Sequence, residues 1–214
     1  MVKLVIFDWD GTLFDSIDKI CFSMLHAGEL ANAPQRKHDD VKNIIGLSLD
    51  KAVDVIWPEL STEEQNIIIE HYKHNFVATD QTPPDAYAGV IETLNTIKNA
   101  GLKMAVATGK SRRGLDRVMA LSNTRDYFVT SRCADEAVSK PDPLMLKQIL
   151  TELNISPEQA IMVGDTEYDL NMATNAGMKS IGVTYGAHDE LRLKACNPHA
   201  LIHNFNQLTH VLGL

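Results

Sequence analysis

Short apolar runs recur along this chain, each followed by a polar or glycine-containing turn and then by a stretch with helical periodicity. The runs occupy residues 4–7, 104–107, 127–130, 160–163 and 180–183, and helical stretches occupy residues 90–100, 113–121, 143–153 and 170–176. Continuous apolar runs of this length are typical of parallel strands that are buried on both faces of a sheet. Because strands alternate with helices, the sequence predicts an α/β fold with a doubly wound, Rossmann-like parallel-sheet core.

Local signals at the ends of these stretches add detail. Asp142 followed by Pro143 is typical of the start of a helix, and the spacing from Ser156 to Gln159 predicts a second helix start. Residues 200–204 have the composition of a short edge strand. The tail from residue 187 onward carries the weakest signals.

One interval, from about residue 16 to residue 81, shows helical periodicity without a convincing strand. Its first apolar face is followed by Gly46, by a helical stretch at 49–57, and by a capping-box spacing from Ser61 to Glu64 ahead of residues 67–76. We therefore predict a core of residues 1–15 and 82–214 with an inserted helical cap of residues 16–81. The insertion follows the first strand, where ligands of α/β sheets bind, so the cap is expected to act as a lid.

Composition excludes several classes of protein. The chain has 214 residues, a formal net charge of -8 and no lysine- or arginine-rich tract, which argues against nucleic-acid binding and favours a small-molecule partner. No apolar stretch approaches the roughly 18 residues that span a bilayer. The three cysteines have no paired spacing, which is typical of a reducing compartment. We expect a cytoplasmic protein that binds no membrane; the sequence leaves its oligomeric state open.

Two aspartates stand directly after the first apolar run. Asp8 and Asp10 are two positions apart, so their side chains lean toward the same side of an extended segment, and Gly11 permits a sharp turn. The pattern Asp-x-Asp-Gly-Thr arises by chance in a chain of this length with a probability on the order of one in a thousand. Chance is therefore a poor explanation, although the pattern alone names no reaction.

With its other motifs, the chain resembles the haloacid dehalogenase-like superfamily. Thr108 matches the threonine at the end of the second core strand, Lys140 matches the lysine at a helix start, and Gly164-Asp165 with Asp169 matches the last acidic motif. The motifs span residues 4–183 in order. Taken singly, each has a structural explanation as a cap or a surface residue. Together they favour a catalytic site.

The resemblance implies a phosphatase that uses Mg²⁺. It makes Asp8 the nucleophile that forms an aspartyl phosphate. It places the metal on the carboxylates of Asp8 and Asp165 and on the backbone carbonyl of Asp10, with Asp169 as a further ligand or as an orienting group. The side chain of Asp10 would protonate the leaving oxygen and later deprotonate the attacking water.

The remaining site residues would bind phosphate. The resemblance assigns this role to the Thr108 hydroxyl and the Gly109 amide, with Lys110 nearby, while Lys140 supplies a positive charge. The loop at Gly46 is where related caps approach the substrate, although a simple helix C-cap explains this glycine equally well.

The second aspartate narrows the reaction. Asp10 disfavours carbon–halogen cleavage and phosphonoacetaldehyde cleavage, because related enzymes for those reactions carry an aromatic residue or alanine there. The helical cap makes the chain most similar to phosphoglycolate phosphatases, which implies hydrolysis of a small phosphorylated metabolite. A sugar-phosphate mutase, a pyrophosphatase and a non-catalytic phosphate-sensing or scaffolding relative remain alternatives.

Overall fold

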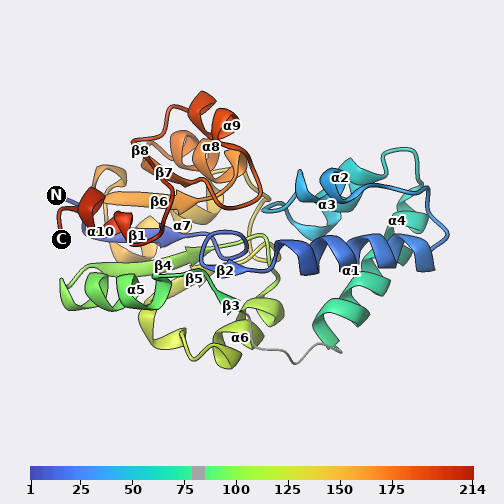
Figure 1. The fold of residues 1–214 in the computed structure, drawn as a ribbon, viewed down its shortest axis with the longest axis horizontal. Helices are drawn as coiled ribbons and strands as arrows, with labels where there is room; N and C mark the ends of the chain where they lie inside the picture. The colour runs from blue at the N-terminus through green and yellow to red at the C-terminus, as the bar shows by residue number, and fades with distance from the viewer. Residues whose placement is uncertain (79–84) are drawn as a thin grey trace.

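The computed structural model describes residues 1–78 and 85–214, and its centre is a parallel sheet (Figure 1). Six strands lie in the order β5-β4-β1-β6-β7-β8, and each pairs in parallel with its neighbours. The strands are β1 (Leu4–Phe7), β4 (Lys103–Ala107), β5 (Thr130–Arg132), β6 (Ala160–Gly164), β7 (Lys179–Val183) and β8 (Ala200–Ile202). The predicted α/β fold is confirmed.

Helices cover both faces of this sheet because strand side chains alternate between them. In β1, Val5 and Phe7 pack in one apolar cluster, whereas Leu4 and Ile6 pack in another. The first cluster includes side chains of α5 (Val90–Asn99), α6 (Arg112–Leu121) and α10 (Gln207–Leu212), and the second includes side chains of α7 (Leu144–Leu153) and α8 (Glu167–Asn175). A short helix, α9 (Glu190–Ala195), lies between β7 and β8 in the chain.

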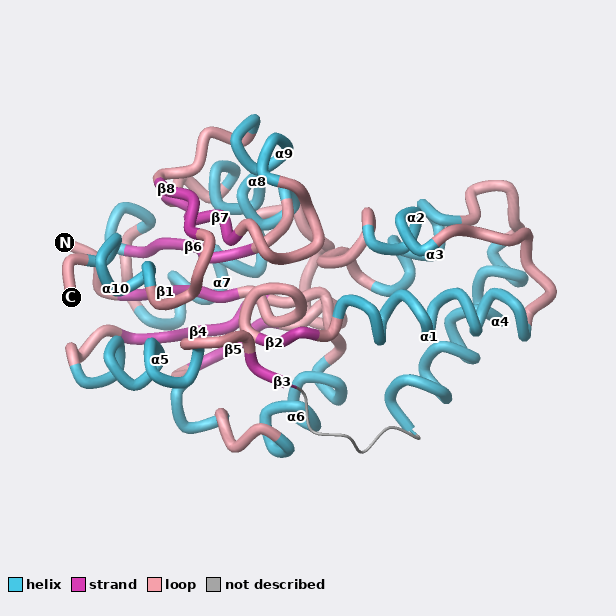
Figure 2. Tube along the Cα trace, viewed as in Figure 1, coloured by secondary structure: helices cyan, strands magenta, loops and turns pink. Residues whose placement is uncertain are grey.

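A second unit of helices lies at one end of the core, opposite the two chain termini (Figure 2). It contains α1 (Ile17–Leu30), α2 (His38–Lys42), α3 (Leu49–Ile56), α4 (Thr62–Tyr72) and the π-helical turn η1 (Lys73–Ala78). We call this unit the cap. Its side chains form a separate apolar cluster that includes Met24, Val53, Trp57 and Ile68. The predicted end of the cap at residue 81 lies outside the described residues.

A two-residue ribbon joins the cap to the core. The strand β2 (Phe14–Asp15) pairs antiparallel with β3 (Asp85–Ala86), so the segment entering the cap lies beside the segment leaving it. Trp9 stacks on Phe14 with ring centroids 4.6 Å apart, which ties this ribbon to the end of β1. The root of the cap is therefore fixed next to the first aspartates.

Two sequence-based assignments were wrong. The run at 127–130 is mostly not a strand: Arg125–Tyr127 form the 3₁₀ turn η2, and β5 begins only at Thr130. Its apolar side chains reflect packing instead, since the ring of Phe128 lies 6.3 Å from that of Phe7. The helix expected from Ser156 is a single 3₁₀ turn, η3 (Pro157–Gln159), because β6 begins at the next residue. Among the described residues, no helix is long and apolar enough to cross a membrane.

Candidate active site

The carboxyl ends of three neighbouring strands bring the predicted residues together. Asp8 follows β1, Thr108 follows β4 and Asp165 follows β6, and these strands are adjacent in the order β4-β1-β6. All three side chains are buried, Asp8 being only 1% exposed. The sheet therefore places three residues that are far apart in the chain in one polar cluster, as expected for ligand sites of α/β folds.

Two glycines allow loops to approach Asp165 closely. Gly11 has a φ of +76°, and a Cβ there would lie 2.3 Å from Oδ2 of Asp165. A Cβ on Gly186 would lie 2.2 Å from Cβ of Asp165. The Asp165 carboxylate accepts hydrogen bonds from the Thr12 hydroxyl (2.8 Å) and from the Ala187 amide (2.7 Å). These contacts fix its orientation toward Asp8.

Lys140 is the buried cation of the cluster. Its Nζ lies 2.8 Å from Oδ1 of Asp8 and 2.7 Å from Oδ1 of Asp169. Burial alone would lower the pKa of Lys140, but the negative charges of Asp169 and Asp8 outweigh it and raise that pKa. Lys140 is therefore held in its charged form beside the predicted nucleophile.

Asp169 orients Lys140 from the first turn of α8. Its Oδ2 accepts hydrogen bonds from the backbone amide (3.1 Å) and the hydroxyl (2.7 Å) of Thr166, which caps the helix. A Cβ on Gly164 would lie 2.3 Å from Cβ of Asp169, so only glycine fits there. Because its oxygens bind Thr166 and Lys140, Asp169 positions the lysine in addition to being a metal-ligand candidate.

The cluster fits a divalent metal ion. Carboxylate oxygens of Asp8, Asp165 and Asp169 lie within 4.8 Å of one another, and all three residues are buried. Three carboxylates against the one ammonium of Lys140 leave two negative charges uncompensated. Oδ2 of Asp8 has no hydrogen-bond partner among the described residues. An all-oxygen donor set with this charge is what Mg²⁺ prefers.

The pKa values of these carboxylates reflect the uncompensated charge. Burial, only partly offset by Lys140, raises the pKa of Asp8 well above its ordinary value, and the charges of Asp169 and Asp165 add to this. Burial and the charge of Asp169 raise the pKa of Asp165 to about 7. A bound divalent cation would favour the ionised forms of both.

Asp10 points away from this cluster and toward the cap. Its Oδ1 accepts a hydrogen bond from the Ser16 hydroxyl (2.5 Å), and its Oδ2 lies 2.9 Å from Nζ of Lys110. Proton transfer by this side chain and metal binding through its backbone carbonyl both stay predictions.

The predicted phosphate-binding segment contacts the cap. Thr108 Oγ1 accepts a hydrogen bond from the backbone amide of Lys110 (3.2 Å), which shapes the turn after β4. A Cβ on Gly109 would lie 2.5 Å from the carbonyl oxygen of Leu47 and 2.7 Å from that of Gly46. The Gly46 loop therefore lies directly against the phosphate segment, and Gly46 itself has a φ of +102°.

A cap–core latch holds the loop that precedes Gly46. The backbone carbonyl of Asn43 accepts hydrogen bonds from the Tyr168 hydroxyl (3.1 Å) and from Nε2 of His188 (3.0 Å), and the Asn43 side chain accepts one from Arg192 (2.5 Å). Nδ1 of His188 accepts from the Glu167 amide at 3.1 Å, so its Nε2 carries the proton. Sequence reasoning missed this latch because no motif or spacing links its members. It also missed Ser16, and it gave Thr12 no role although Thr12 ends the first motif.

A cavity of about 280 Å³ lies between the core and the cap. It brings together most of the predicted site residues. Those that line it are Asp8, Asp10, Gly46, Thr108, Gly109 and Lys110, whereas Lys140, Asp165 and Asp169 lie behind Asp8 and do not line it.

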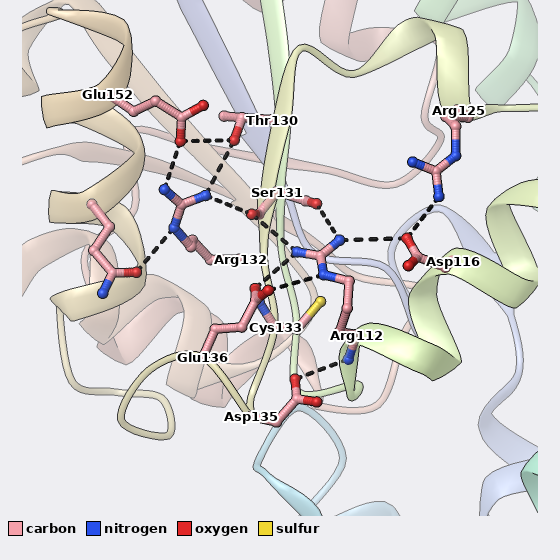
Figure 3. A network of polar contacts seen from close by, with 11 residues as sticks. Arg112, Asp116, Arg125, Thr130, Ser131, Arg132, Cys133, Asp135, Glu136 and Glu152 are labelled. Carbon is pink, nitrogen blue, oxygen red and sulfur yellow. Dashed lines mark hydrogen bonds and ion pairs between the residues drawn. The ribbon is translucent and has the colours of Figure 1, made fainter.

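A network of hydrogen bonds and ion pairs lies beside this cavity and includes Asp135, which lines it (Figure 3). Arg112, at the start of α6, donates hydrogen bonds to Glu136 (2.8 Å) and to the Ser131 hydroxyl (2.8 Å), and its backbone amide donates to Asp135 (2.9 Å). The hydrogen bond from Arg112 lowers the pKa of Glu136. Because Asp135 also lines the cavity, the network fixes part of its wall.

Comparisons with known proteins show which family the chain is similar to. A family profile described as "Haloacid dehalogenase-like hydrolase" matches residues 5–183. The chain is 33% identical over 213 residues to "Probable phosphatase IndB" of Dickeya dadantii, covering 97% of this chain and 92% of that protein. It is 31% identical over 216 residues to "Pyrophosphatase PpaX" of Bacillus velezensis, covering 100% and 97%.

Two further comparisons bear on substrate and fold. The chain is 29% identical over 219 residues to a phosphoglycolate phosphatase of Vibrio vulnificus, covering 99% of this chain and 96% of that protein. A crystal structure of a haloacid dehalogenase-like hydrolase from Bacteroides fragilis superposes with a TM-score of 0.90 at 22% identity, covering 97% of this chain and 100% of that one. The latter similarity confirms the fold.

Proposed function

We propose a reaction and a mechanism for this chain, which belongs to the haloacid dehalogenase-like hydrolase family. The chain is a phosphatase of that family. The proposal is that it hydrolyses a small phosphorylated metabolite through an aspartyl phosphate on Asp8, with Mg²⁺ as cofactor. One observation carries it: Asp8 is buried, is ion-paired to Lys140 through Oδ1, and has no hydrogen-bond partner on Oδ2 within the described chain.

The first half-reaction begins with Oδ2 of Asp8. This oxygen attacks phosphorus, the bond from phosphorus to the ester oxygen breaks, and that oxygen leaves with the electron pair. Asp10 donates the proton that converts the departing oxygen to a hydroxyl. The Thr108 hydroxyl, together with the Gly109 amide, binds the transferring phosphoryl group, and Lys140 orients Asp8 and favours its ionised form.

The second half-reaction regenerates Asp8. Water attacks the phosphorus of the aspartyl phosphate while Asp10, now a carboxylate, takes its proton, and inorganic phosphate leaves. The ion pair with Lys110 and the hydrogen bond from Ser16 hold the Asp10 side chain in place for this step. Mg²⁺, held by Asp8 and Asp165, would neutralise charge on the phosphoryl oxygens.

The names of the relatives suggest the first substrates to assay. Proteins named phosphoglycolate phosphatase and pyrophosphatase align along nearly the whole chain, so 2-phosphoglycolate and pyrophosphate join a panel of phosphorylated metabolites. A sugar phosphate in the panel tests the mutase alternative, since a mutase yields an isomerised product with little free phosphate.

The test is phosphate release from this panel and from p-nitrophenyl phosphate, with Mg²⁺ and with EDTA. We expect release by the wild type that requires Mg²⁺ and is lost in the Asp8→Asn variant. The matched control is Asp15→Asn, which changes an exposed aspartate in the same segment. Turnover that survives Asp8→Asn would overturn the proposal, as would the absence of turnover on every substrate.

A further inference from the structure

The cap contributes mostly apolar side chains to the cavity. Ile20 and Met24 of α1, Leu47 of the Gly46 loop, Ile69 and Tyr72 of α4, and Phe76 of η1 line it. We call these six residues the apolar wall. Its side chains come from four separate segments of the cap, so the wall is a product of the fold and not of one helix face.

Two aromatic rings bring this wall close to the proton donor. Tyr72 and Phe76 stack with centroids 5.2 Å apart and an interplanar angle of 15°. Nζ of Lys110 lies 5.2 Å from the centroid of Phe76 and 2.9 Å from Oδ2 of Asp10. The ammonium group of Lys110 therefore contacts both the ring of Phe76 and the carboxylate of Asp10, which is the proposed proton donor.

The ionisation of Tyr72 agrees with that placement. Burial and the negative charge of Asp10 raise the pKa of Tyr72, which keeps its phenol neutral. A neutral phenol and a phenyl ring offer a leaving group flat apolar surface and one hydrogen-bonding tip.

Lys73 and Lys110, which line the cavity, each have an ionic partner. Lys73 of the cap is paired with Glu70 at 2.9 Å, and Lys110 is paired with Asp10 at 2.9 Å. Arg117 lines the cavity from α6 of the core, and its charge opposes the effects of burial and of Asp10 on the pKa of Tyr72. The six residues of the apolar wall carry no charge themselves, so packing on them favours an apolar group.

The size of the cavity suits a ring. An apolar cavity of about 150 Å³ holds one benzene molecule. The cavity here measures about 280 Å³ and includes the surfaces of Asp8 and Thr108, where phosphate binds. It therefore holds a phosphate group together with a leaving group the size of one ring.

We propose that the preferred substrate is a phosphate monoester whose leaving group is an apolar or aromatic alcohol that packs against the apolar wall. This inference rests on the proposed function and refines its substrate class. It ranks 2-phosphoglycolate and pyrophosphate below esters of aromatic alcohols, because neither of those substrates offers the wall an apolar group to pack against it.

The experiment compares kcat/KM for 2-phenylethyl phosphate and n-hexyl phosphate with kcat/KM for glycerol 3-phosphate, 2-phosphoglycolate and pyrophosphate. These alkyl esters have poorly activated leaving groups, so a preference for them reflects binding. We expect the apolar esters to be favoured by about tenfold or more. Tyr72→Ser should remove most of that preference, with little effect on glycerol 3-phosphate. The control Phe22→Ala removes an aromatic side chain of α1 that is 72% exposed, and should change nothing.

The outcomes separate the two proposals. If 2-phosphoglycolate or pyrophosphate is favoured, and its turnover depends on Asp8, the apolar-substrate inference is overturned and the proposed function stands. Equal losses for apolar and polar esters in Tyr72→Ser would also overturn the inference, since they would show a purely structural role. If no substrate yields Asp8-dependent phosphate release, the proposed function fails and the inference fails with it.

Discussion

Nζ of Lys140 lies 2.8 Å from Oδ1 of Asp8, and both side chains are buried, Asp8 in the lining of the cavity and Lys140 behind it. Because an unpaired buried charge is strongly unfavourable, Asp8 helps to keep Lys140 charged, and Lys140 partly offsets the burial that raises the pKa of Asp8. This ion pair therefore matters for both stability and catalysis. Lys140 stabilises the buried carboxylate of Asp8 and also orients it as the proposed nucleophile.

Replacing this lysine should therefore affect both properties. We expect Lys140→Met to lower kcat by about a hundredfold or more. It should also reduce the free energy of unfolding by about 3–5 kcal/mol near neutral pH, because Asp8 and Asp169 lose their partner. Steady-state kinetics and urea unfolding measure the two effects. Lys51→Met, which removes an exposed lysine paired with Asp54, should leave both nearly unchanged. Near-normal kcat in Lys140→Met would contradict the assigned role.

The raised pKa values predict how metal binding depends on pH. The pKa of Asp165 is about 7 in the metal-free fold and 3.8 ordinarily, so between these values the native state holds a proton that the unfolded chain has released. The stability contributed by Asp165 is thus greatest below its ordinary pKa and is lost as pH rises toward about 7. Mg²⁺ binding requires the ionised carboxylates, so protons compete with it at low pH.

Thermal unfolding with and without Mg²⁺ tests this dependence. The increase in Tm caused by Mg²⁺ should be larger at about pH 8 than at about pH 5.5, because Asp8 and Asp165 are then largely free of protons. In Asp165→Asn the increase should be small at both pH values. An equal increase at both pH values in the wild type would show that these carboxylates do not bind the ion.

The contact between Gly109 and the cap loop predicts the effect of one methyl group. In Gly109→Ala the new Cβ would meet the carbonyl oxygens of Leu47 and Gly46, which cannot move as easily as a flexible side chain. We expect kcat/KM to fall by about tenfold, because the cap loop and the phosphate segment are pushed apart. Gly101→Ala is the control: alanine is strained at the φ of +77° there, but its Cβ would meet nothing within 4 Å and Gly101 does not line the cavity, so kcat/KM should stay near that of the wild type. Wild-type kinetics in Gly109→Ala would mean that this contact is unimportant for catalysis.

The cap–core latch predicts a different kinetic signature. His188→Ala removes a side chain that bridges the Asn43 carbonyl and the Glu167 amide, so the cap should open more readily. We expect KM to rise by several-fold to about tenfold, with a smaller change in kcat, and stability to fall by about 1–3 kcal/mol. The exposed His210 of α10 provides the control variant His210→Ala. If kcat falls while KM is unchanged, the latch acts on chemistry and not on the cap.

The parallel sheet could be predicted, because a strand that is buried on both faces has a continuous apolar run that can be recognised from the sequence alone. The ribbon of β2 and β3 was not predictable, since its strands have two residues each and form only because the two ends of the cap segment meet. The misplaced strand near Phe128 has a similar cause: an apolar side chain there packs on Phe7 instead of continuing a ladder. An apolar pattern in the sequence shows that side chains are buried, but a side chain can be buried either within a strand or by packing outside one.

The site likewise contains residues that could be predicted from the sequence and contacts that could not. Asp8, Thr108 and Asp165 follow strand ends, and Lys140 lies in a turn before α7 and not at the helix start that the sequence predicts. All four could be found because each belongs to a recognisable motif. The pairing of Asp10 with Lys110 could not be found, because it depends on how the loops after β1 and β4 fold toward each other. The latch around Asn43 could not be found, because it depends on how closely the cap approaches the core. The apolar wall could not be found either, because the periodicity of its segments predicts only that these side chains are buried inside the cap.

The proposed aspartyl phosphate on Asp8 can be trapped chemically. The enzyme is mixed with substrate and Mg²⁺, quenched with borohydride to reduce any acyl phosphate, and digested for peptide mass spectrometry. We expect homoserine at position 8 in place of aspartate, and none in a sample without substrate. Continued phosphate release with unmodified aspartate at position 8, under conditions where a known aspartyl phosphate is trapped, would contradict it.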